Sequence, residues 1–69
     1  EAAAAFRRAV ELQPSWTPAR INLAVALAQT GRVGEAIDHL QKVLEIQPEN
    51  EYARRVLTAL LTKGNRPLP

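Results

Sequence analysis

The sequence of 69 residues contains no cysteine and no methionine. Without cysteine the chain can form no disulfide, carries no thiolate nucleophile and offers no thiolate ligand to a metal. The absence of cysteine is consistent with a reducing compartment such as the cytoplasm, although it would suit any other compartment. The localisation of the protein therefore stays unassigned.

An excess of charge of one sign and long apolar runs are also lacking. Nine basic and seven acidic residues give a formal net charge of +2, which is too mild to indicate a nucleic acid or a membrane surface as partner. The longest apolar run, 23–28, has six residues, whereas crossing a bilayer takes roughly 18. We therefore expect a protein or peptide partner, no nucleic acid, and no membrane insertion by this segment.

The sequence begins inside a helical pattern, without an initial methionine or a signal segment. We therefore expect it to be part of a longer protein. At this length it forms at most one small domain, which buries about 60% of its unfolded surface. The core must be thin and built from local contacts between helices.

An internal repeat dominates the sequence. Residues 1–16 return as 35–50, and a fixed period of this length is typical of stacked-repeat proteins, which present surfaces to partners. Five of the sixteen aligned pairs are identical: Glu1/Glu35, Ala2/Ala36, Glu11/Glu45, Gln13/Gln47 and Pro14/Pro48.

Proline, glycine and capping residues predict where the first two helices begin and end. The first, 1–12, ends at Gln13, since a residue before proline is pushed out of the α region. Thr17 followed by Pro18 predicts the N-cap of the second helix, and Gly31 supplies its left-handed stop. The second helix is apolar nearly all round, which predicts burial on several sides.

Two more helices follow. The third begins near residue 33 or 34 and ends before Pro48, and Asn50 caps a fourth that runs to Lys63 and stops at Gly64. The fourth keeps its apolar residues to one stripe, as the last helix of a stack should, because a terminal unit needs a polar outer surface. Residues 65–69 are predicted to be a disordered tail.

The unit 17–50 resembles a tetratricopeptide repeat, a helix-turn-helix whose period matches the one in this sequence. The family's small and apolar places are taken by Leu23, Ala24, Leu27, Ala36, Leu40 and Pro48. The resemblance implies an all-α fold, a right-handed α-α superhelix (helix-turn-helix solenoid) with four helices in the order B-A-B-A. Residues 1–16 would be the second helix of a truncated repeat, 17–50 a complete repeat, and 51–64 the first helix of a following repeat or a C-terminal capping helix.

The resemblance has departures. Arg20 occupies the family's tryptophan place, while Ala24 and Leu27 replace its glycine and tyrosine. The two-carboxylate clamp that some members use needs a lysine and an arginine where Tyr52 and Val56 stand. That specialised activity is therefore not expected.

The resemblance implies a concave groove, lined by the first helices of successive repeats, that binds a peptide or partner segment. Asn22 is a polar amide in an otherwise apolar helix. It would either form a hydrogen bond with the backbone of a bound peptide or form one within the scaffold. Arg55 and Lys63 would either make one end of the groove basic or be solvated. Carried over by position, the groove residues are Ile21, Asn22, Val25, Gln29, Tyr52, Arg55, Ala59 and Lys63.

No residue pattern indicates catalysis, a cofactor or a metal. His39, the only histidine, has no converging partners and is expected to be a solvated surface residue. Ser15, the only serine, is expected to be a turn residue rather than a nucleophile. Glu45, Glu49 and Glu51 lack the loop of a cation site. We therefore predict a binding protein, not an enzyme.

Self-association is the alternative function. Ala2 and Phe6 would lose a packing partner if the preceding helix is absent, which would leave an apolar edge that favours homo-oligomers. A third idea is a regulatory attachment to an enzyme outside this sequence. Trp16 lies in the turn between repeats, where it either staples the turn to the next helix or serves as an exposed anchor for a partner.

Overall fold

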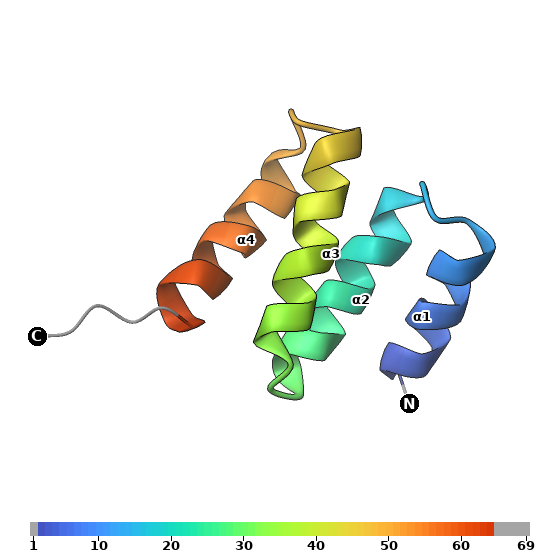
Figure 1. The fold of residues 1–69 in the computed structure, drawn as a ribbon, viewed down its shortest axis with the longest axis horizontal. Coiled ribbons are helices and arrows are strands. Elements are labelled where there is room, and N and C mark those ends of the chain that lie inside the picture. Colours follow the sequence, from blue (N-terminus) through green and yellow to red (C-terminus); the bar gives the residue numbers. More distant parts are fainter. Residues whose placement is uncertain (1, 65–69) are drawn as a thin grey trace, which may run out of the picture.

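The computed structural model describes the backbone of residues 2–64 and the side chains of residues 3–62. Within that range it contains four helices, α1 (Ala2–Leu12), α2 (Thr17–Gln29), α3 (Val33–Ile46) and α4 (Glu51–Gly64), and no strand. The helices lie side by side in chain order, joined by turns at alternate ends (Figure 1). The predicted all-α helix-turn-helix solenoid is confirmed, whereas the predicted tail, 65–69, lies outside the described residues.

The glycine stop predicted for α2 is confirmed. Gly31 has φ +91°, its N–H donates to the carbonyl of Ala28 at 3.1 Å, and the N–H of Arg32 donates to the carbonyl of Leu27 at 2.8 Å. This pair of hydrogen bonds is a Schellman motif, which needs a left-handed residue at the position after the C-cap. Glycine is there because a Cβ would disfavour that backbone conformation.

One predicted cap is correct and one is wrong. Asn50 Oδ1 accepts the backbone N–H of Ala53 at 2.9 Å, as expected of the N-cap of α4. Thr17, however, is already the first residue of α2, and Trp16 stands at the N-cap without a side-chain capping bond. Thr17 therefore lies one residue too late to cap α2, and its hydroxyl donates instead to Gln47 in the turn after α3.

The second helix forms the centre of the core. Within the described range the backbone of α2 lies close to that of all three other helices, whereas the backbone of α1 lies close only to that of α2. Its buried residues, spread around the helix as its apolar sequence predicts, are Thr17, Ala19, Ile21, Leu23, Ala24, Ala26 and Leu27. Ala24 and Ala36 are both 0% exposed, and side chains as small as theirs leave room for α2 and α3 to approach closely. None of the described helices is both long and apolar enough to cross a membrane.

Candidate functional site

A hydrogen-bond network joins the ends of α2, α3 and α4. The Oε1 atom of Gln47, at the C-cap of α3, accepts Thr17 Oγ1 at 3.0 Å and Asn50 Nδ2 at 2.9 Å. Asn50 also caps α4 through its side-chain oxygen, Oδ1. Thr17 is only 3% exposed, while Gln47 and Asn50 are partly buried, so the network is partly shielded from water and links the three helix ends.

A hollow of about 370 Å³ opens beside this network, between the first turns of α2 and α4. We call it the α2–α4 hollow. Its volume falls in the range of small-ligand pockets, about 300–1,000 Å³, so it can receive a side chain or a short segment of a ligand. Its lining contains no charged residue and consists of Thr17, Pro18, Ile21, Asn22, Gln47, Asn50 and Tyr52.

Three of the residues predicted to line a groove meet in this hollow. Ile21 is buried and forms its apolar wall, Asn22 is exposed, and Tyr52 is 58% exposed. Asn22 takes part in none of the hydrogen bonds found among residues 3–62. Its amide is therefore available to a ligand rather than committed to the scaffold.

The other predicted groove residues lie beyond the hollow. Val25 is partly buried, and Gln29, Arg55 and Ala59 are exposed on α2 and α4. None of these four lines the hollow. The side chain of Lys63 lies outside the described residues, so the predicted basic end of the groove is represented by Arg55 alone.

The sequence interpretation missed the role of the arginine at the family's tryptophan place. Arg20 Nη2 and Nε donate to the carbonyl oxygen of Pro14 at 2.8 and 3.3 Å, and Arg54 Nη2 donates to that of Pro48 at 2.9 Å. Both arginines thus tie the turn after the preceding helix to their own helix. The signal was present in the sequence, because both the arginine and the proline recur exactly one repeat later.

The expectation that His39 is a solvated surface residue is wrong. The ring is partly buried, and its Nδ1 lies 3.2 Å from Arg20 Nη1. Since a guanidinium can only donate, Nδ1 accepts and the ring is neutral with its proton on Nε2. Burial lowers the pKa of His39 below its ordinary 6.5 and the positive charge of Arg20 lowers it further, although Glu35 opposes the shift.

The residues predicted to form a self-association edge are only partly placed. Phe6 is half-buried and packs against the core, while the side chain of Ala2 lies outside the described residues. Large exposed apolar side chains occur elsewhere: Leu12 is 70% exposed and Trp16 is 51% exposed. The half-exposed indole is compatible with either role considered for Trp16.

The residues weighed for chemistry do not converge on a reactive site. Ser15 is exposed in the turn between α1 and α2. Among the side chains that the structure describes, no group of three or more histidine, aspartate or glutamate residues could hold a metal ion. The arrangement thus offers hydrogen-bonding and apolar contacts to a ligand.

Comparison with known proteins adds two findings. The family model described as "Tetratricopeptide repeat" matches residues 1–65. The chain is also similar to the mouse (Mus musculus) protein sperm-associated antigen 1, at 33% identity over 51 residues, which is 74% of this chain and 6% of that protein. The chain therefore spans a small part of this relative's length. No solved structure matches the chain.

Proposed function

The chain belongs to the tetratricopeptide repeat family, and we propose that it binds an extended segment of a partner protein in the α2–α4 hollow. The repeat is a non-enzymatic scaffold fold whose members generally mediate protein–protein interactions. The partner segment would continue from the hollow along the exposed sides of α2 and α4, past Gln29, Arg55 and Ala59.

The arrangement of free hydrogen-bonding groups around an apolar wall supports this proposal. Gln47 uses Oε1 for the network, so its amide N–H groups remain available beside the amide of Asn22 and the hydroxyl of Tyr52. Amides both donate and accept, as the backbone of an extended peptide does at every residue. Ile21 and Pro18 offer apolar contact to one side chain of the bound segment.

The chemistry of the hollow selects the kind of segment. Since its lining is uncharged, a charged side chain placed there would lose water without gaining an opposite charge. The residue that enters the hollow should therefore be apolar. Arg55, exposed on the second turn of α4, would favour a carboxylate further along the segment.

The test uses a peptide selected from a displayed random library as the probe, with affinity measured by fluorescence anisotropy. Asn22→Ala and Tyr52→Ala are expected to raise Kd about fivefold or more, the effect of losing roughly 1 kcal/mol of contact. Gln41→Ala removes an equally exposed amide from α3 and should leave Kd unchanged. Equal effects of Asn22→Ala and Gln41→Ala would place the ligand elsewhere.

Self-association is the second candidate, because several large apolar side chains on the described surface are exposed. Leu12→Ser tests it better than Phe6→Ser, since Phe6 also packs against the core and its loss would destabilise the fold. Sedimentation should show a mass that rises with protein concentration and a weaker rise for Leu12→Ser. A monomer at all concentrations would exclude this function.

A further inference from the structure

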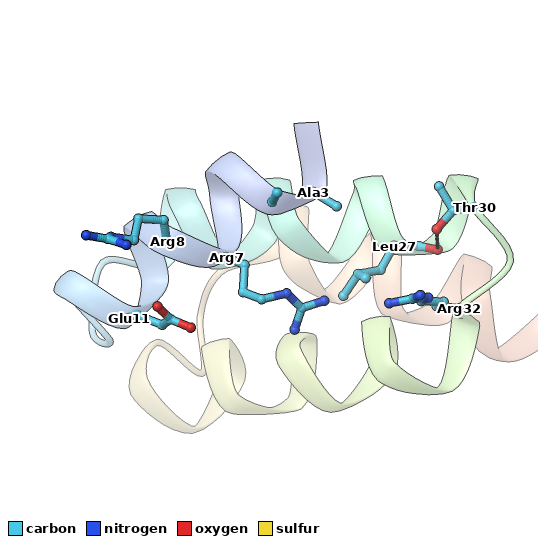
Figure 2. Close-up of a pocket in the computed structure, with 8 residues that line it drawn as sticks. Ala3, Arg7, Arg8, Glu11, Leu27, Thr30 and Arg32 are labelled. Carbon is cyan, nitrogen blue, oxygen red and sulfur yellow. Dashed lines mark hydrogen bonds between the residues drawn. The ribbon is translucent and has the colours of Figure 1, made fainter. Parts of the chain in front are cut away.

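A second hollow, of about 490 Å³, lies between α1 and Arg32, the residue at the N-cap of α3. We call it the α1–α3 cleft. In the described part of the chain α1 and α3 make no direct backbone contact. Leu27 of α2, which is 1% exposed, forms the bottom of the gap between them. Figure 2 shows Arg7 reaching into the gap from α1 and Arg32 reaching toward it from the turn after α2.

The cleft lies on the opposite side of α2 from the α2–α4 hollow. Pro18 lines the hollow and Leu27 lines the cleft. They are nine residues apart, which at about 100° per residue places them on opposite sides of the helix. A ligand in the cleft therefore contacts none of the residues assigned to the groove, and the two sites can be occupied independently.

The charge of the cleft is positive and incompletely neutralised. Arg7 Nη1 lies 3.2 Å from Glu35 Oε2, and Arg32 Nη1 lies 4.0 Å from the other oxygen of the same carboxylate. Two guanidinium groups thus share one carboxylate. Arg8 lines the cleft as well and has no ion-pair partner among residues 3–62, while Glu11 is the single acidic residue of the lining.

We propose that the α1–α3 cleft is a second docking site, which binds an acidic segment of a protein that also carries an apolar side chain. Arg8 and Arg32 bind carboxylates of that segment, because a guanidinium offers paired N–H donors that match a carboxylate. The apolar side chain packs against the alanines of α1 that line the cleft, the exposed Ala4 and its neighbour Ala3. Glu35 limits the affinity by holding Arg7 and competing for Arg32.

Charge distribution favours an acidic protein segment over a nucleic acid. A phosphate backbone is bound by several cations along an extended basic surface, whereas this chain carries a net charge of only +2. The cleft also places Glu11 among its arginines, which would repel one of a row of phosphates. An acidic peptide can leave a neutral residue at that position.

The test measures the anisotropy of a labelled peptide of glutamates around one leucine, against the same peptide with lysines in place of glutamates. Wild type should bind only the acidic peptide. Arg8→Glu and Arg32→Glu should each raise Kd about tenfold, as expected when an exposed ion pair becomes a repulsion. Glu35→Gln should lower Kd about threefold, since it leaves both Arg7 and Arg32 unopposed.

Arg55→Glu, an equal charge change on α4, separates this cleft from the groove. If Arg55→Glu raises the Kd of the acidic peptide as much as Arg8→Glu does, the peptide responds to the net charge of the protein or binds in the groove, and the proposal is wrong. It is equally wrong if Glu35→Gln weakens binding, or if a labelled single-stranded oligonucleotide binds more tightly than the peptide. All variants change side chains that are at least partly exposed, and far-UV circular dichroism should show unchanged helix content.

Discussion

Two arginines at equivalent places of the repeat offer a matched pair of substitutions, Arg20→Met and Arg54→Met. Each replacement keeps an unbranched side chain that packs along the helix and removes the guanidinium. Arg54 loses one hydrogen bond to a turn carbonyl. Arg20 loses two such bonds and also its contact with His39. The pair therefore compares Arg54, which only bonds to a turn, with Arg20, which bonds to a turn and also contacts His39 on α3.

The expected losses of stability follow from these contacts. A hydrogen bond to a charged group contributes about 1.5–3 kcal/mol when shielded, and an exposed one contributes roughly half of that or less. The bonds to Pro14 and Pro48 are exposed. We expect Arg54→Met to lower the free energy of unfolding by about 0.5–1 kcal/mol and Arg20→Met by about 1–2 kcal/mol.

The two variants should also differ in how stability depends on pH. Because the pKa of His39 is lowered in the folded state, the unfolded state binds more protons in the window just below 6.5. The stability that depends on neutral His39 is therefore fully present above pH 6.5 and is lost as pH falls through the lowered folded pKa. Arg20→Met removes one cause of the lowered pKa of His39 but leaves the burial of the ring. The free energy of unfolding of this variant should therefore fall less steeply with decreasing pH than that of wild type.

The assay is urea unfolding followed by far-UV circular dichroism, once above pH 6.5 and once at about pH 5. Above pH 6.5 Arg20→Met should be the less stable variant, and the gap to wild type should narrow at the lower pH. His39→Gln should remove most of the acid-dependent loss. Equal destabilisation by Arg20→Met and Arg54→Met at both pH values would mean that the contact with His39 contributes nothing, and the reasoning would be refuted.

Two further pairs of substitutions test the turns by urea unfolding. Gly31→Ala should cost about 1–2 kcal/mol because φ is +91°. Gly34→Ala, inside α3 with open space around the added methyl group, should gain about 0.5 kcal/mol; a loss at Gly34 would contradict this account. Asn50→Ala removes the cap of α4 and a bond to Gln47, so it should cost about 1–2 kcal/mol. Asn22→Ala should stay within about 0.5 kcal/mol of wild type, and similar losses in both asparagine variants would exclude the capping role.

The sequence predicts the helices well because the features that set them are local. Gly31 and Asn50 end and begin helices through bonds to residues three to five positions away, so a one-dimensional pattern contains them. Thr17 was misread because α2 begins one residue earlier than predicted and the hydroxyl bonds to Gln47, thirty positions away. His39 was misread for the same reason, since its neighbour Arg20 comes from another helix.

The candidate site was partly predictable for a related reason. The family's geometry predicts which positions of α2 and α4 would face a groove, and three of them, Ile21, Asn22 and Tyr52, line the α2–α4 hollow. It does not predict that Gln47 joins them, because that depends on hydrogen bonds of Gln47 with Thr17 of α2 and with Asn50. The arginines of the α1–α3 cleft were missed because their positions on separate segments become close only in the folded chain.

The repeat itself distinguishes residues that hold the fold from residues that face a ligand. A position that packs the same way in each unit faces the same constraint twice, and such positions recur one repeat later, as Arg20 and Arg54 do. Three positions on α2 that line the α2–α4 hollow do not recur: Pro18 aligns with Tyr52, Ile21 with Arg55, and Asn22 with Val56. Stacking alone would accept similar residues at both members of each pair, so these differences are of the kind that a second constraint on α2 and α4 would produce. Contact with a partner supplies one, because an asymmetric segment lying across α2 and α4 meets a different part of itself on each helix.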